Sequence, residues 1–254
     1  MKTGILVFIV MALLLSACGT NRASFSPAKK YAADILQKDY AIYEQILEEA
    51  HPGLYWYTTK DSMDRYFEWG RQQLKDSLTE PDFRKVLNYV TAKINCGHTS
   101  VRSSKSYSSY LDTVRLGRLF PLSLKIWDDT AVISANLHRR DTVLTRGVMI
   151  NKINGRSIKE IVDTCFEFIP TDGYNTTHKF QSLSNRGYFG SLYTSIYGMY
   201  DSYNIEYTDS TGKVKNTTIR AYYPAADTFS RAVLRSTTPM PQPSRKERKE
   251  RQRS

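Results

Sequence analysis

The spacing of the apolar residues changes near residue 100, and this change restricts the folds open to the chain. Before it, apolar residues recur at the intervals of helices that bury one face. These segments are 31–47, 62–74 and 79–94. After it, apolar and polar residues alternate on both sides of short turns, as they do in β-hairpins. The alternating segments are 120–127, 131–135, 203–207 and 214–221. Separate runs of helices and strands are typical of α+β folds, so we predict a helical N-terminal domain followed by a β-rich domain.

Capping and turn residues predict where the elements begin and end. Ser26-Pro27 predicts a helix start, because a hydroxyl cap followed by proline at the first helical position is favourable. His51-Pro52-Gly53 should end that helix, and we expect His51 to have this structural role. Thr79 should cap a later helix, with Asp82 as its partner. Residues 100–110 are rich in serine and tyrosine without periodicity, which predicts a strand end followed by a linker or loop.

The first 18 residues have the pattern of an export signal. Lys2 precedes an apolar run from Ile5 to Leu15, which is too short to span a bilayer. Leu15-Ser16-Ala17-Cys18 resembles the lipobox of bacterial lipoproteins, which implies lipid attachment to Cys18 and cleavage before it. An ordinary cleaved signal peptide with an incidental cysteine is the alternative. No acidic residue directly follows Cys18, which favours the outer membrane. We therefore expect a protein of the bacterial cell envelope, anchored in the membrane by lipid and facing the periplasm or the cell surface.

The net charge of +11 does not by itself indicate a nucleic-acid partner. Export would separate the chain from nucleic acid, and part of the charge lies in the run 245–253, with six basic and two acidic residues. Such a run is usually a solvated tail, with anionic lipid headgroups as the alternative partner. Apolar periodicity also stops after Pro224, so we predict a disordered linker and basic tail. Cys96 and Cys165 are too few for a disulfide-dense scaffold, and no metal-binding spacing or cofactor motif occurs.

The stretch from Gly147 to Gly155 has the length of two short apolar strands and ends in an Asn-Gly turn, and Ser157 should cap the helix that follows. This order of hairpin, strand, short helix and final strands is similar to a PDZ domain of the bacterial protease type, over about 114–223. The resemblance implies a groove in which an extended peptide or a protein C-terminus adds as a strand. No peptide-binding residue can be assigned from the sequence. A small β domain with a common hairpin is the alternative.

Two further motifs extend the resemblance to nearly the whole mature chain. His51-Pro52-Gly53-Leu54-Tyr55 and Ile94-Asn95-Cys96-Gly97-His98-Thr99-Ser100 are similar to the start of tricorn-like, C-terminal-processing serine peptidases. In that family a helical cap, a PDZ-like domain and a catalytic core follow in order, and the histidine of the Gly-His-Thr element is the general base. The resemblance implies that role for His98, whose neutral imidazole can accept a serine proton. The predicted parts are a signal peptide 1–18, a tether 19–25, a helical domain 26–110, a PDZ-like domain 111–224 and a tail 225–254.

The nucleophile of that family lies in the core after the PDZ-like domain, and no Gly-x-Ser-x-Gly turn occurs in this sequence. We therefore expect a fragment or shortened relative of the peptidase that is inactive alone, with His98 acting only beside a complete core. One alternative is a complete peptide-binding adaptor lipoprotein of the PDZ type. Another is an independent hydrolase that uses His98 with an unrecognised nucleophile.

Two other groups of side chains have competing interpretations. Cys96 precedes His98 by two residues, but a cysteine–histidine dyad also needs an orienting group and oxyanion donors. An aromatic cluster could line a groove for peptide or glycan, although packing in the core is the expected use. Its members are Tyr188, Phe189, Tyr193, Tyr197 and Tyr200.

Overall fold

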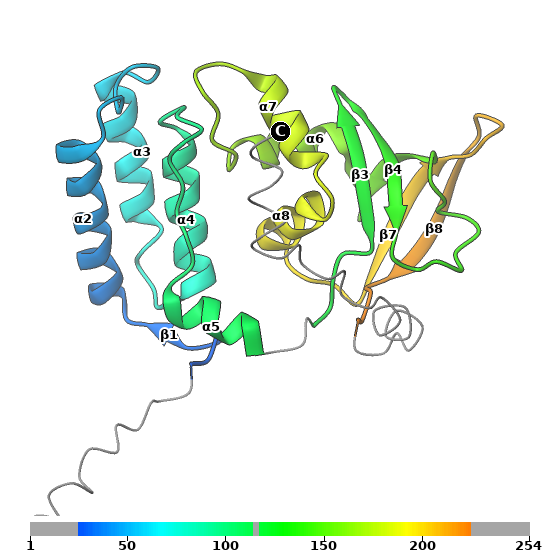
Figure 1. Ribbon diagram of the computed structural model, residues 1–254, viewed down its shortest axis with the longest axis horizontal. Coiled ribbons are helices and arrows are strands. Elements are labelled where there is room, and N and C mark those ends of the chain that lie inside the picture. Colours follow the sequence, from blue (N-terminus) through cyan, green and yellow to red (C-terminus); the bar gives the residue numbers. More distant parts are fainter. Residues whose placement is uncertain (1–24, 114–116, 225–254) are drawn as a thin grey trace, which may run out of the picture.

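The computed structural model describes residues 25–113 and 117–224, which form an α+β fold. Helices come first along the chain and an antiparallel, β-rich region follows, so the predicted fold class is confirmed. Figure 1 shows α2, α3 and α4 side by side at one end of the molecule, the sheet at the other, and α6 to α8 between them. The predicted signal peptide, most of the tether and the basic tail lie outside the described residues.

The helical part has three long helices and short elements at their ends. They are β1 (Lys30–Tyr31), α2 (Ala33–Ala50), α3 (Lys60–Gln72), β2 (Leu78–Thr79), α4 (Glu80–Ala92) and α5 (Lys105–Thr113). Thr79 caps α4 as predicted, because its hydroxyl accepts a hydrogen bond from the Asp82 amide at 3.3 Å. The core of this part forms where the apolar faces of α2, α3 and α4 meet, with Met63, Phe67 and Val90 fully buried.

Two sequence predictions for the helical part are wrong. The first long helix does not start at Ser26-Pro27 but at Ala33, because Lys30 and Tyr31 are extended and pair with β2. Residues 100–104 have no regular structure, as the predicted loop would, but no strand ends there and residues 105–110 are helical, since α5 begins at Lys105. Ser104 accepts a hydrogen bond from the Tyr107 amide at 3.0 Å and so caps this helix. The serine- and tyrosine-rich segment is thus helical through contacts that periodicity does not reveal.

The β-rich part is one antiparallel sheet with helices against it. Its elements are β3 (Leu122–Trp127), β4 (Thr130–Asn136), β5 (Met149–Ile153), β6 (Arg156–Ser157), α6 (Ile158–Phe166), α7 (Thr176–Leu183), α8 (Tyr188–Tyr197), β7 (Ser202–Thr208) and β8 (Val214–Arg220). The strand order is β3-β4-β5-β7-β8, with β6 paired to β5. Both predicted hairpins are present as β3–β4 and β7–β8. Helices α7 and α8 pack against β3, and α6 packs against β4 and β5, so the core lies between these helices and the sheet.

Local signals in the β-rich part are confirmed. Asn154 and Gly155 have φ values of 49° and 80°, which gives the tight reversal between β5 and β6. Ser157 caps α6 in a capping box with Glu160, and each residue binds the other's backbone amide. The hydrogen bonds from Ser157 lower the pKa of Glu160.

The two parts are joined by residues 167–174, between α6 and α7, which we call the junction segment, and α4 also contacts α8. Its contacts are made with α4, with the loop after α4 and with the loop after α2. They are an ion pair from Glu167 to Lys93, ring contact of Phe168 with Tyr89, hydrogen bonds from Gly97 to Asp172, from Gly173 to Asn95 and from Tyr174 to the Tyr57 carbonyl. One short segment therefore fixes the β-rich part against the helices.

Within residues 25–113 and 117–224, no helix is both long enough and apolar enough to cross a bilayer.

Candidate functional site

His98 lies in a loop that leaves α4 through a sharp change of backbone direction. Asn95 adopts a left-handed conformation with φ of 56°, which asparagine tolerates better than most residues. Its side-chain amide donates to the Thr58 hydroxyl at 3.2 Å, so the turn is fixed to the loop before α3. The chain then presents His98 to solvent, with 89% of its side chain exposed. The candidate base is thus accessible, on a loop that is held at its root.

His51 holds the same loop on the other side of His98. Its Nδ1 accepts a hydrogen bond from the Gly53 amide at 3.2 Å, so in a neutral ring the proton is on Nε2. That Nε2 lies 2.8 Å from the Thr99 hydroxyl and therefore donates to it. His51 also ends α2, as its sequence context predicts, because its amide donates to the Leu47 carbonyl. The residue thus does more than end a helix, since it fixes the residue next to His98.

Asp172 is the acidic neighbour of His98 and comes from the junction segment. Its Oδ1 accepts a hydrogen bond from the Gly97 amide at 2.7 Å, and its Oδ2 lies 3.5 Å from His98 Nε2. This second distance is longer than a hydrogen bond, as is common for catalytic contacts in the absence of substrate. The carboxylate is anchored by the backbone and faces the imidazole. Sequence reasoning missed Asp172, because it lies in a Thr-Asp-Gly turn whose only local signal is structural.

An exposed imidazole beside a carboxylate that is anchored by the backbone is an arrangement that can take part in proton transfer. A carboxylate beside one ring nitrogen orients the imidazole and stabilises its protonated form, leaving the other nitrogen to accept a proton. In the part of the chain that the structure describes, no serine, threonine or cysteine side chain hydrogen-bonds to the His98 ring. Cys96 is partly buried against the core of the helical part, which does not support a dyad with His98.

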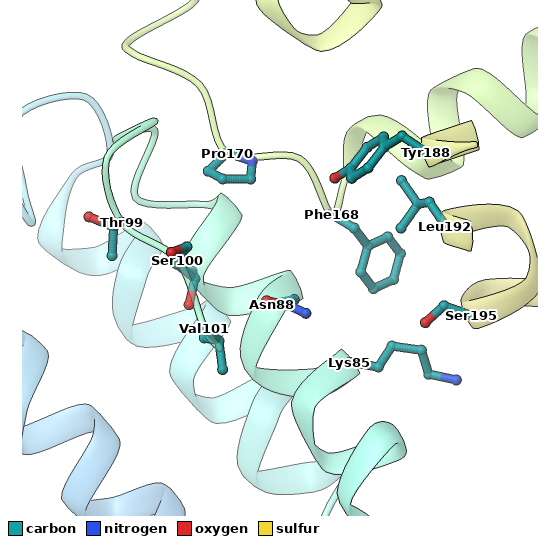
Figure 2. Close-up of a pocket in the computed structure, with 11 residues that line it drawn as sticks. Lys85, Asn88, Thr99, Ser100, Val101, Phe168, Pro170, Tyr188, Leu192 and Ser195 are labelled. Carbon is teal, nitrogen blue, oxygen red and sulfur yellow. The ribbon is translucent and has the colours of Figure 1, made fainter. Parts of the chain in front are cut away.

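A cleft of about 280 Å³ lies between α4 and α8 and continues from the His98 loop (Figure 2). The residues that line it come from α4, from 99–101, from the junction segment with Pro170, and from α8. They are Lys85, Asn88, Thr91, Thr99, Ser100, Val101, Phe168, Pro170, Tyr188, Leu192 and Ser195. Thr99 and Ser100, which line the cleft, directly follow His98 in the chain, although His98 itself is not among the described lining residues.

The five residues of the predicted aromatic cluster have different surroundings: Tyr197 packs against the core while partly buried, and Tyr200 is exposed. Phe189 and Tyr193 are buried in the core of the β-rich part, so packing is their role. Tyr188 instead lines the cleft, where Figure 2 shows its ring near Pro170. Partial burial raises the pKa of the Tyr188 hydroxyl, which therefore remains a neutral hydrogen-bond donor at physiological pH.

The remaining histidines are not part of this site. His138 lies 2.9 Å from the Arg220 carbonyl, and His178 lies 3.4 Å from the Ser182 hydroxyl on its own helix. No group of three or more histidine, cysteine, aspartate or glutamate residues within 25–113 and 117–224 could hold a metal ion. The sequence prediction of no metal site stays a prediction.

Comparison with known proteins gives matches in fold but not in sequence. No family model matches the chain, and no curated protein is significantly similar to it. Among solved structures, a crystal structure of a CPAF mutant matches with a TM-score of 0.51 and 10% identity, covering 75% of this chain and 34% of CPAF. Mature CPAF complexed with lactacystin gives a TM-score of 0.49, 11% identity, and 75% and 35% coverage.

CPAF is a chlamydial, tricorn-like serine protease with a PDZ domain. The resemblance predicted from the sequence is thus confirmed at the level of fold, over three-quarters of this chain and about a third of CPAF.

Proposed function

We propose that this chain is the cap and PDZ-like part of a tricorn-like serine peptidase, in which His98 is the general base and Asp172 positions it. The observation that carries the proposal is the His98–Asp172 pair, with 3.5 Å between imidazole and carboxylate, on two loops tied to each other and to α2. The partial fold match to CPAF supports the same assignment. The chain spans about a third of CPAF's length, so the activity of a whole protease is part of the proposal.

In the proposed reaction, His98 removes the proton from a serine hydroxyl as that oxygen attacks a peptide carbonyl. Asp172 stabilises the imidazolium that forms, and His98 then gives the proton to the leaving amine. The serine and the oxyanion donors would come from a core outside the residues described here, because no hydroxyl within them reaches His98. We infer that the 254-residue chain does not cleave peptides by itself.

The proposed location rests on the sequence. The apolar run ending in Leu15-Ser16-Ala17-Cys18 supports a lipid anchor on Cys18. With the anchor in the outer membrane, the folded parts would face the periplasm or the surface, where peptides and protein C-termini are the available partners.

A peptide-binding adaptor is the second candidate function, and an open pocket beside β3 favours it. The pocket has a volume of about 260 Å³ and polar walls from Lys125, His178, Gln181 and Ser184, among others. However, the Ser184 hydroxyl binds both the amide and the carbonyl of Ile126, at 3.0 and 3.3 Å, where an added strand would pair. If the adaptor function holds, Ser184→Ala should strengthen the binding of extended peptides by freeing this edge.

Turnover by the purified chain separates these functions. A fluorogenic protein substrate should show no cleavage above that of a His98→Ala variant, and a serine-directed fluorophosphonate should leave the chain unlabelled. Turnover that the fluorophosphonate abolishes would overturn the proposal and favour an independent hydrolase. Peptide binding that becomes stronger with Ser184→Ala would favour the adaptor.

A further inference from the structure

The cleft between α4 and α8 contains polar side chains whose hydrogen-bonding groups are not used within the described structure (Figure 2). Lys85 and Asn88 lie three residues apart on α4 and therefore share a face. Ser100 and Ser195 add hydroxyls from the His98 loop and from α8. No hydrogen bond or ion pair links any of these four side chains to another described residue. By contrast, Thr99 already accepts from His51. The cleft thus presents groups that a ligand could bind.

The charge of the lining selects the sign of the ligand. Lys85 is the cation of the cleft, and no aspartate or glutamate is among the described lining residues. The acidic residues in the first turn of α4 have other partners, because Asp82 accepts from the Thr79 hydroxyl at 2.6 Å and Glu80 accepts hydrogen bonds from Ser104. A desolvated carboxylate in the cleft would gain a charge-assisted hydrogen bond from Lys85, with amide and hydroxyl donors beside it.

The opposite wall is apolar and suits one aliphatic or aromatic side chain. Phe168 and Leu192 face the cleft from the junction segment and α8, and Pro170 continues this surface, whereas Val101 lies on the other side, beside α4. A volume of about 280 Å³ is near the lower limit of ordinary ligand pockets, so it accommodates a short piece of peptide and not a large cofactor.

We infer that this cleft is a substrate subsite that binds a peptide through an apolar side chain adjacent to a carboxylate. The inference rests on the proposed function, because the cleft is lined by Thr99 and Ser100, which directly follow the proposed base His98 in the chain. The carboxylate can belong to an aspartate or glutamate side chain or to a peptide C-terminus, and both have the chemistry that Lys85 recognises.

Fluorescence polarisation with labelled hexapeptides tests the inference on the full 254-residue chain. One peptide has an internal Leu-Glu pair and an amidated end, a second has Leu-Gln instead, and a third ends in leucine with a free carboxylate. The wild-type chain should bind the first or the third, and replacing glutamate by glutamine, or amidating the third peptide, should weaken binding about tenfold or more. The peptide whose binding weakens shows whether the cleft binds a side-chain carboxylate or a C-terminal one.

Lys85→Gln should weaken binding of the carboxylate-bearing peptide by a similar factor. The same variant should bind the uncharged peptide no more weakly than the wild type does, because the interaction between Lys85 and the carboxylate is already absent. Lys75→Gln removes the same charge from an exposed position outside the cleft, and should bind as the wild type does. Leu192→Ser should weaken all peptides. Thermal unfolding of each variant checks that it remains folded.

Equal affinity of the Lys85→Gln and Lys75→Gln variants for every peptide would overturn the inference, as would a wild-type chain that binds none of them. Neither result would affect the proposed function, whose own test measures turnover and fluorophosphonate labelling.

Discussion

Gly173 fixes the junction segment in place, and replacing it with alanine should loosen the candidate site. Its φ of +63° is a left-handed conformation that costs an L-residue about 1–2 kcal/mol. A Cβ here would also lie 3.0 Å from Cε1 of Tyr57, so the ring would have to move, at a cost of about 1 kcal/mol. The two effects together predict a loss of about 2–3 kcal/mol in the free energy of unfolding.

Gly212→Ala is the matched control, because Gly212 has a φ of +79° and a Cβ at this position would meet nothing within 4 Å. Its free energy of unfolding should fall only by the cost of the left-handed backbone, about 1–2 kcal/mol, which lowers the unfolding midpoint by about 2–8 °C. Gly173→Ala should lose about 4–12 °C by the same conversion.

Calorimetry gives both midpoints, and amide hydrogen exchange tests the local consequence. The Gly97 amide donates to Asp172 and should exchange faster in Gly173→Ala but not in Gly212→Ala. Equal losses of stability in the two variants, with unchanged protection of Gly97, would refute the idea that the junction segment holds the site together.

Three further predictions concern the core of the helical part, the two described cysteines and the lipid anchor. Gly70→Ala should lower the free energy of unfolding, measured with denaturant, by about 2–4 kcal/mol, because the new Cβ would overlap the Tyr40 hydroxyl that donates to the Phe67 carbonyl. A decrease below about 1 kcal/mol would contradict this packing. Burial raises the pKa of Cys165 to about 12, so a thiol reagent at pH 8 should label Cys96 and spare Cys165 until the chain unfolds. Above the usual cysteine pKa of about 8.5, the Cys165 thiol ionises in the unfolded state but not in the folded state, so the free energy of unfolding should fall as the pH rises above this value. Rapid labelling of Cys165 in the native chain would refute its burial. Cys18→Ala should remove the lipid mass and the membrane-bound fraction, and unchanged values of both would exclude a lipid anchor on this residue.

Elements set by neighbouring residues could be predicted from the sequence. The Thr79 cap, the Asn154-Gly155 reversal and the Ser157 capping box each depend on residues within a few positions of one another. The hydrogen bonds and backbone angles of these features depend on residues close together in the sequence, so the sequence pattern predicts them. The partial resemblance to a tricorn-like protease was also visible, because its motifs and the order of elements lie along the chain.

Features set by distant contacts could not be predicted. The extended pair Lys30–Tyr31 exists because β2 supplies its partner about 50 residues later, and this pairing overrides the Ser26-Pro27 helix signal. Asp172 follows His98 by 74 residues in sequence and approaches it only because the junction segment crosses from one part to the other. The role of His98 is therefore a hypothesis from the sequence, whereas its acidic neighbour Asp172 is found only in the structure.

His98 is proposed as the base of a serine peptidase whose nucleophile lies outside the described residues. The most direct measurement of this role is the rate at which a fluorophosphonate labels that serine when the chain is joined to, or mixed with, a core domain that carries it. His98→Ala should slow labelling and peptide cleavage by about 10²–10⁴, as expected for loss of a positioned base, whereas His138→Ala should leave both rates unchanged. Full labelling and cleavage with His98→Ala would contradict the assignment of His98 as the base.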